Sequence, residues 1–143
     1  MSGAETPLLA EWIISQTSDA LIYADREGRI QRWNTAASAL FGYDEDQALG
    51  ASLDLIIPEH LRAAHWAGFH AAIESGQTRL HGHPALTRAV RKDGGKLYVE
   101  MTFALVRDDK GVAVGSVAMA RDVTERVEKE RAARRQSGGT APG

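Results

Sequence analysis

The sequence contains no cysteine. This absence excludes disulfide bonds, thiolate nucleophiles and cysteine-ligated zinc sites, and it fits a reducing compartment. No apolar run approaches the ~20 residues that are needed to cross a bilayer, and the N-terminal stretch MSGAETPLLAEW lacks a basic region followed by an apolar one. We therefore expect a cytoplasmic protein, or the cytoplasmic piece of a larger one, without a membrane span.

A large net charge is also missing. The 143 residues carry a formal net charge of -2, so we expect no nucleic-acid binding. No glycine-rich phosphate loop follows a predicted strand, and no set of nucleophile, base and orienting residue can be assembled, so we expect no enzyme activity. The length, with 43% hydrophobic and 25% charged residues, suits one soluble domain with its own core.

The first part of the chain predicts a helix followed by a strand hairpin. TPLLAEWIISQ has apolar residues at helical spacing behind Thr6 and Pro7, which would serve as the cap and first-turn pair. ALIYADREGRIQRWN has two strand-like runs around a polar turn, as in a β-hairpin. The helix has an apolar face that we expect to bind a partner, unless the helix folds back onto its own sheet. This face consists of Leu8, Leu9, Trp12 and Ile13.

Helices are then followed by strands. TAASALFGYDEDQALG predicts one or two short helices, and a longer helix would begin at Pro58-Glu59 and end at Ser75-Gly76. Residues 78–91, 96–106 and 112–121 are strand-like runs separated by KDGG and RDDKG, turn sequences that join antiparallel neighbours. This order predicts an α+β fold whose antiparallel sheet packs its helices on one face.

The charged stretch VTERVEKERAARRQ predicts a solvated helix. Glu125 with Lys129 and Glu130 with Arg134 are i,i+4 pairs in the favourable orientation. The apolar seam of this stretch is thin, so the alternative is a frayed charged tail. SGGTAPG, which follows it, has the composition of a flexible end.

The predicted long helix carries a histidine on its apolar side. Leu61, His65, Phe69, Ala72 and Ile73 fall on one stripe of a 3.6-residue helix, and such a stripe normally faces the core. We therefore expect His65 to point inward. The alternative is an ordinary half-buried histidine that hydrogen-bonds a nearby carbonyl and needs no ligand.

Several ordered motifs together resemble the PAS domain family, the small sensory modules of signalling proteins. They are ALIYADREGRIQRWNTAASALFGYDEDQALG, the proline-led long helix, RKDGGKLYVEM and RDVTER, and they cover about residues 8–126. Asp122-Val123-Thr124 matches the DxT signature of the family at the exit to a signalling helix. The resemblance implies a five-stranded antiparallel sheet with flanking helices and a ligand pocket between the sheet and the long helix. It divides the chain into an N-terminal flanking helix (1–18), a PAS sensory domain (19–122), a signalling helix (123–136) and a flexible tail (137–143).

Within the family, the chain is most similar to the heme-binding, oxygen-sensing PAS domains of nitrogen-fixation sensor kinases. In those domains the long helix begins with Pro-Glu and carries an R-x-x-H segment whose histidine ligates the iron. IPEHLRAAH has Pro58, Glu59, Arg62 and His65 at the same spacing. The resemblance thus implies that His65 is the proximal ligand of heme b in a sensor of a diatomic gas or of redox state. A neutral imidazole is a good ligand for heme iron.

The resemblance also implies an apolar lining of the pocket. Its members would be Phe69, Leu80, Met101 and Phe103, which would exclude water from a bound gas. Each of these residues also suits the plain core that any PAS interior requires.

Two positions depart from the heme-binding pattern. Ala85 stands where the subfamily has the arginine that hydrogen-bonds oxygen, and Ala71 stands where it has an arginine associated with the heme propionates. Arg79 would be a substitute that pairs with a propionate, or else a surface residue. Met101 would be a candidate to approach the iron from the other side.

Other ligands remain open. His81-x-His83 places two imidazoles on one predicted strand face as a candidate zinc pair, but the spacing fixes no third ligand. Trp33-Asn34 and Trp66 are similar to features of flavin-binding PAS relatives, or else the tryptophans are ordinary packing residues beside an apolar pocket. The missing cysteine excludes the adduct photochemistry of light-sensing flavin modules. The alternatives to heme are therefore a flavin or another small ligand, or no cofactor in a dimerisation and protein-interaction module. We expect a homodimer through the N-terminal and exit helices, and a downstream output domain in the full-length protein.

Overall fold

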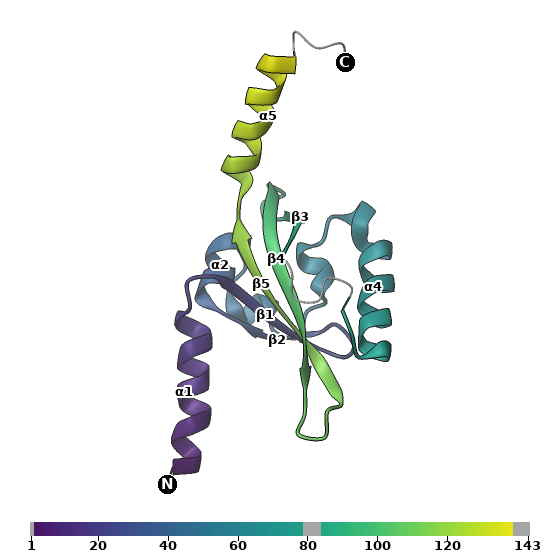
Figure 1. Ribbon diagram of the computed structural model, residues 1–143. Coiled ribbons are helices and arrows are strands. Elements are labelled where there is room, and N and C mark those ends of the chain that lie inside the picture. Colours follow the sequence, from purple (N-terminus) through teal and green to yellow (C-terminus); the bar gives the residue numbers. More distant parts are fainter. Residues whose placement is uncertain (1, 79–83, 139–143) are drawn as a thin grey trace.

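A five-stranded antiparallel sheet forms the centre of the molecule (Figure 1). The computed structural model describes residues 2–78 and 84–138, with the side chains of residues 8–78 and 84–137. The strand order is β2-β1-β5-β4-β3, and every neighbouring pair is antiparallel. The strands are β1 (Ala20–Asp25), β2 (Ile30–Trp33), β3 (Ala85–Val90), β4 (Lys96–Arg107) and β5 (Ala113–Asp122).

Helices flank this sheet, and two of them extend away from it. α1 and α5 project from the body of the domain in opposite directions, so the start of α1 and the end of α5 lie far apart (Figure 1). α5 follows directly from β5, the central strand, and its start therefore lies at the middle of the sheet. The helices are α1 (Ser2–Gln16), α2 (Thr35–Phe41), α3 (Glu45–Ala48), α4 (Arg62–Ser75) and α5 (Thr124–Gly138), with 3-10 turns η1 (Leu53–Ile56) and η2 (Glu59–Leu61).

The core lies between one face of the sheet and the helices α2 and α4. Successive strand side chains point to opposite faces, and in β1 the alternate residues Ala20, Ile22 and Ala24 are the buried ones. They share one apolar cluster with Phe41 of α2 and Phe69 of α4. The predicted α+β architecture, with a five-stranded antiparallel sheet and flanking helices, is confirmed.

The two turn sequences connect neighbouring strands as predicted. In KDGG, the backbone N–H of Arg91 donates to the carbonyl of Gly95 at 2.8 Å, which closes the β3–β4 hairpin. In RDDKG, the N–H of Asp108 donates to the carbonyl of Val112 at 2.9 Å, which closes the β4–β5 hairpin.

The element boundaries differ from the prediction at two helix starts. α1 begins at Ser2, so the expectation that Thr6 and Pro7 cap this helix is wrong. The residues before Thr6 include alanine and glutamate, which are strong helix formers, and a proline close to a helix start removes few backbone hydrogen bonds. The long helix begins with the 3-10 turn η2 before α4 starts at Arg62, because the tighter i,i+3 hydrogen bonding is common at helix ends.

The remaining differences concern β3 and the C-terminal end. β3 begins at Ala85, so it is shorter than the predicted run 78–91; residues 79–83 lie outside the described residues. α5 extends through Gly138, while residues 139–143 lie outside the described residues. Among the helices in the described part of the chain, none is long and apolar enough to cross a membrane.

Candidate functional site

His65 lies on the side of α4 that faces the core. Its neighbours on that side, Phe69, Ala72 and Ile73, are buried, and His65 itself is half-buried. The Nδ1 atom of His65 is buried and makes no hydrogen bond with the residues that the structure describes. A buried polar atom normally has a partner, because an unpaired one retains its desolvation cost. The alternative, in which His65 is held by an ordinary carbonyl hydrogen bond, is therefore not realised at Nδ1.

Burial also sets the protonation state of this imidazole. Desolvation lowers the pKa of His65 from its ordinary value of 6.5, with a smaller contribution from His70, while the nearby Asp54 carboxylate acts in the opposite direction. His65 is therefore neutral at neutral pH. A neutral imidazole keeps a nitrogen lone pair available for a metal ion.

Aromatic rings connect His65 to the sheet. The ring centroids of His65 and Phe69 are 6.0 Å apart, and those of Phe69 and Phe103 are 6.4 Å apart in an edge-to-face arrangement. Phe69 is almost completely buried, and Phe103 of β4 packs against the same apolar cluster. The structure thus brings His65, Phe69 and Phe103 together.

Met101 and Ala85 lie next to each other on adjacent strands. Met101 pairs with Ala85 of β3 and with Ala120 of β5 in the strand register. It lies two residues from Phe103, and it packs against the core cluster with Phe103, so both face the helices. Ala85 and Met101 are therefore on the expected side of the sheet, and neither offers a charged hydrogen-bond donor.

The remaining expected site residues lie away from this cluster or outside the described residues. Arg79 and Leu80 lie outside the described residues, as do His81 and His83 of the candidate zinc pair. Ala71, where the heme-binding pattern has an arginine, is exposed on α4. Within the described residues, no group of three or more histidine, aspartate or glutamate side chains is arranged to hold a metal ion.

Trp66 connects α4 to two distant segments that the sequence did not associate with it. Its indole Nε1 donates a hydrogen bond to the Asp54 carboxylate of η1 at 2.7 Å. Its six-membered ring covers Gly28 in the β1–β2 turn so closely that a Cβ at Gly28 would overlap it. Trp66 thus packs α4 against these two segments, and no spacing in the sequence relates residues 28, 54 and 66.

Arg62, one turn before Trp66, forms hydrogen bonds to the segment that contains η1. Its Nε donates to the carbonyl of Ile57 at 3.1 Å, and its Nη2 donates to the carbonyl of Asp54 at 3.3 Å. The arginine of the R-x-x-H segment therefore turns toward η1, and it anchors the start of α4.

The junction between the sheet and α5 is closely hydrogen-bonded. The backbone N–H of Tyr98 on β4 donates to Thr124 Oγ1 at 2.9 Å, and the N–H of Val123 donates to the Tyr98 carbonyl at 2.9 Å. Val123 and Val127 are buried, and the Arg131 guanidinium lies 4.9 Å from the centre of the Tyr98 ring. The predicted exit helix is thus attached to β4 as well as continuous with β5.

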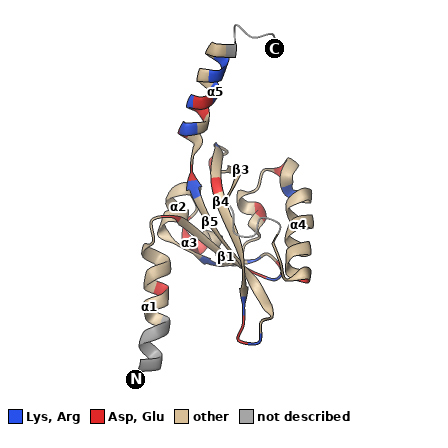
Figure 2. Ribbon diagram, viewed as in Figure 1, with Lys and Arg blue, Asp and Glu red and all other residues tan. Residues whose placement is uncertain are grey.

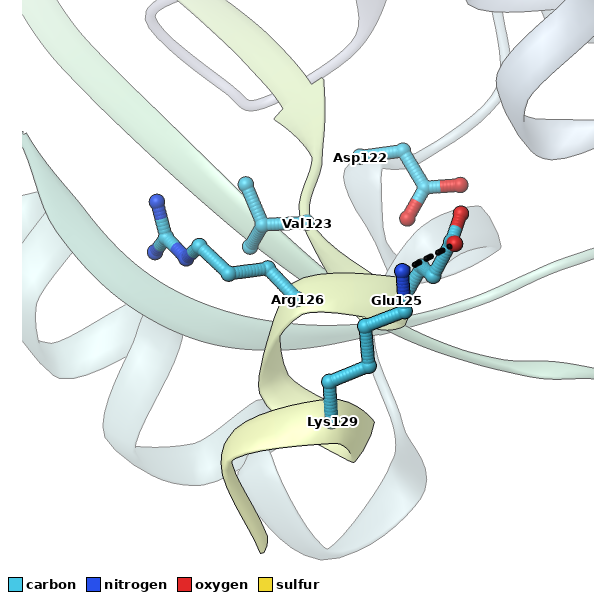
Figure 3. A pocket seen from close by; sticks show the side chains of 5 residues that line it. All are labelled: Asp122, Val123, Glu125, Arg126 and Lys129. Carbon is cyan, nitrogen blue, oxygen red and sulfur yellow. Dashed lines mark ion pairs between the residues drawn. The ribbon is translucent and has the colours of Figure 1, made fainter. Parts of the chain in front are cut away.

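An open hollow lies beside this junction (Figure 3). In it, Lys129 Nζ pairs with Glu125 Oε1 at 2.9 Å, as the sequence spacing predicts. Lysine and arginine alternate with acidic residues along α5 (Figure 2). The hollow is lined by Asp122, Val123, Glu125, Arg126 and Lys129, and His65 is not among them.

The apolar face of α1 points away from the domain. Trp12 is 52% exposed and Ile13 is 61% exposed, and Leu8 and Leu9 are similarly exposed. On another side of the helix, Glu11 Oε1 lies 2.9 Å from Arg32 Nε of β2. The alternative in which this face folds back onto its own sheet is therefore wrong, because the four side chains remain open to solvent.

Comparisons with known proteins agree with this architecture. A family model described as the PAS fold matches residues 14–128. The oxygen sensor protein DosP of Escherichia coli (strain K12) is 28% identical over 118 residues, which are 82% of this chain and 14% of that protein. The sensor protein FixL of Bradyrhizobium diazoefficiens is 30% identical over 82 residues, which are 57% of this chain and 16% of that protein. The chain thus spans only a small part of the length of these relatives.

Solved structures give the same fold. A PAS domain from Colwellia psychrerythraea has a TM-score of 0.72 at 22% identity, with 85% of this chain and 99% of that chain covered. An RNA-binding light-oxygen-voltage receptor also has a TM-score of 0.72, at 24% identity, with 95% of this chain and 38% of that chain covered. With the family model matching most of the chain, and with these structures sharing its sheet and helices, the chain belongs to the PAS fold family.

Proposed function

We propose that this PAS domain is a sensory module that binds heme b through His65 and responds to a diatomic gas or to the redox state of the iron. The observation that carries the proposal is the buried, unpartnered Nδ1 of an imidazole that burial keeps neutral. An inward imidazole with an unpartnered nitrogen has the donor chemistry that heme iron requires. Two relatives whose names describe sensors, one of them an oxygen sensor, support the same class of function.

The residues around His65 suit an apolar, planar group. Phe69 packs on one side of the imidazole, and Met101 and Phe103 provide apolar surface from β4. The bound heme would supply an iron atom that coordinates a gas or changes its oxidation state. The chain itself would supply the ligand and exclude water, while Arg79 and Leu80 remain candidates on the basis of the sequence alone.

The signal would leave through the junction with α5. β4 carries Met101 and Phe103 on its inner face, and it holds Thr124 through the backbone of Tyr98. A shift of β4 would therefore change the position of α5, and with it an output domain elsewhere in a full-length cytoplasmic protein. In this proposal the PAS domain itself has no catalytic activity.

Absorption spectroscopy tests this proposal. Purified protein should show a strong Soret band after it is supplemented with hemin, and His65→Ala should lose the band of the ligated heme while it keeps its circular dichroism. His60→Ala is the matched control, because His60 is exposed at the start of the same helical region. A spectrum that is unchanged in His65→Ala would exclude this histidine as the ligand. A flavin spectrum in the purified protein would instead favour the flavin alternative.

A second candidate function is a cofactor-free dimerisation module. The observation that favours it is the exposed apolar face of α1, since an apolar patch of this kind commonly marks a protein interface. A second copy of the chain would present the same face, and such twofold packing is the commonest form of self-association. The two functions are compatible, because α1 and α4, the helix that carries His65, lie on different parts of the domain (Figure 1).

A further inference from the structure

We propose that Trp66 is a positioning residue for His65, which it holds toward the interior by fixing the rotation of α4 about its axis. The proposal rests on the proposed function of His65, and it assigns the neighbouring residue a separate task.

The two side chains leave α4 in different directions. Consecutive residues on an α-helix are about 100° apart around the axis, so the direction of one side chain determines that of the next. The rings of His65 and Trp66 meet edge to face with centroids 4.7 Å apart. If Trp66 is held from outside the helix, His65 cannot rotate out of the interior without breaking the contacts of Trp66.

Trp66 is held from outside at two points. The hydrogen bond to Asp54 fixes the indole N–H end, and the close contact with Gly28 fixes the opposite, six-membered ring. Asp54 and Gly28 belong to different segments, because η1 follows α3 whereas Gly28 lies in the β1–β2 turn. The N–H of Leu53 donates to the Gly28 carbonyl at 3.1 Å, so these two segments also support each other.

Only glycine leaves room for the indole at position 28. Gly28 has φ of +79°, a conformation that favours glycine in any case, and a Cβ there would overlap the Trp66 ring. Gly50 has nearly the same φ, +83°, but a Cβ there would meet nothing within 4 Å. Gly28→Ala and Gly50→Ala should therefore introduce the same backbone strain. Only Gly28→Ala should also displace the Trp66 ring.

The first experiment measures whether His65 is accessible in the unloaded protein. Diethyl pyrocarbonate acylates accessible neutral imidazoles, and peptide mass spectrometry reports its rate at each histidine. The exposed His60, which makes no ring contact with Trp66, serves as the internal reference. In Trp66→Ala and Gly28→Ala we expect acylation of His65 to accelerate roughly tenfold relative to His60, because the constraint is lost. Gly50→Ala should leave this ratio unchanged.

The second experiment measures hemin affinity by Soret titration. Trp66→Ala should weaken binding roughly tenfold, and Trp66→Phe, which keeps an aromatic ring but lacks both the N–H that bonds Asp54 and the outer ring atoms that lie over Gly28, should weaken it nearly as much. Trp12→Ala removes an exposed tryptophan from α1, so it should change neither readout. Placing Gly28→Ala in the Trp66→Ala background should add no further effect, because the ring that the added methyl group would meet is already gone.

The outcomes separate this proposal from the proposed function. If the wild-type protein binds no hemin but Trp66→Ala and Gly28→Ala expose His65, heme binding fails and the positioning role stands. If acylation of His65 is unchanged in Trp66→Ala, Trp66→Phe and Gly28→Ala, while urea unfolding shows that the variants are folded, the positioning role is wrong. Burial of Phe69 and Ile73 would then be sufficient to orient α4.

Discussion

Tyr98 of β4 donates its backbone N–H to Thr124 Oγ1 at 2.9 Å, and the same hydroxyl lies 3.4 Å from the Tyr98 carbonyl oxygen. Thr124 is the first residue of α5, so one side chain joins the strand that carries Met101 and Phe103 to the exit helix. The ion pair between Arg126 and Glu100, at 3.8 Å, adds a second connection between the same two elements. β4 is thus in contact with both the candidate site and the output helix.

Removal of the Thr124 hydroxyl should loosen this connection. Thr124→Val keeps the shape of the side chain but leaves the Tyr98 N–H without its partner, so we expect a loss of about 1 kcal/mol in the free energy of unfolding. Amide hydrogen exchange in the first turn of α5 should accelerate as well. Thr124→Ser retains the hydroxyl and should behave nearly as wild type. Identical exchange in the valine and serine variants would contradict this role.

Stability of the unloaded protein should depend on His65 at mildly acidic pH. Burial lowers the pKa of the His65 imidazole in the folded protein. As the pH falls, the unfolded chain therefore takes up a proton on His65 at a higher pH than the folded chain does. The folded state therefore loses stability as the pH falls through the unfolded-state value of 6.5, until His65 itself becomes protonated. Between about pH 7.5 and about pH 5.5, urea unfolding should show a larger loss for wild type than for His65→Gln. The control His60→Gln should follow wild type, and equal losses in both variants would refute the assignment.

A heme-loaded protein should discriminate against oxygen. Bound oxygen is stabilised by a hydrogen-bond donor, which carbon monoxide needs less, and neither Ala85 nor Met101 supplies a charged donor. We expect fast dissociation of oxygen and ordinary retention of carbon monoxide in flash photolysis. Ala85→Arg should slow oxygen release, whereas Leu86→Arg, on the exposed opposite face of β3, should not. A long-lived oxygen complex in wild type would show that another donor reaches the gas.

Self-association should depend on the apolar face of α1. We expect the wild-type chain to dimerise in light scattering at several concentrations, and a chain without residues 1–18 to be a folded monomer. Trp12→Glu combined with Ile13→Glu tests the same face without shortening the helix, because charges would be buried in the interface. Ala10→Glu, which is exposed but lies off this face, is the control. If the wild-type chain is monomeric at high protein concentration, the dimer proposal is wrong.

The order of the elements could be predicted because it depends on local patterns. Alternating apolar residues indicated the strands, glycine-rich polar sequences indicated the hairpins, and apolar residues at 3.6-residue spacing placed His65 on the inner side of its helix. Each of these signals lies within a few residues, so it does not depend on the rest of the fold. The start of α1 was predicted wrongly because a proline near a helix end is tolerated at several positions.

Only the tertiary structure determined which residues surround His65 and whether the apolar face of α1 is exposed to solvent. Trp66 meets Asp54 and Gly28 only because the β1–β2 turn and η1 come together beside α4, and no sequence spacing encodes a contact between such distant segments. Likewise, the apolar face of α1 suits either its own sheet or a partner, and the direction in which α1 leaves the domain determines that the face is exposed. Periodicity specifies which side of an element is apolar; packing among distant elements determines what that side contacts.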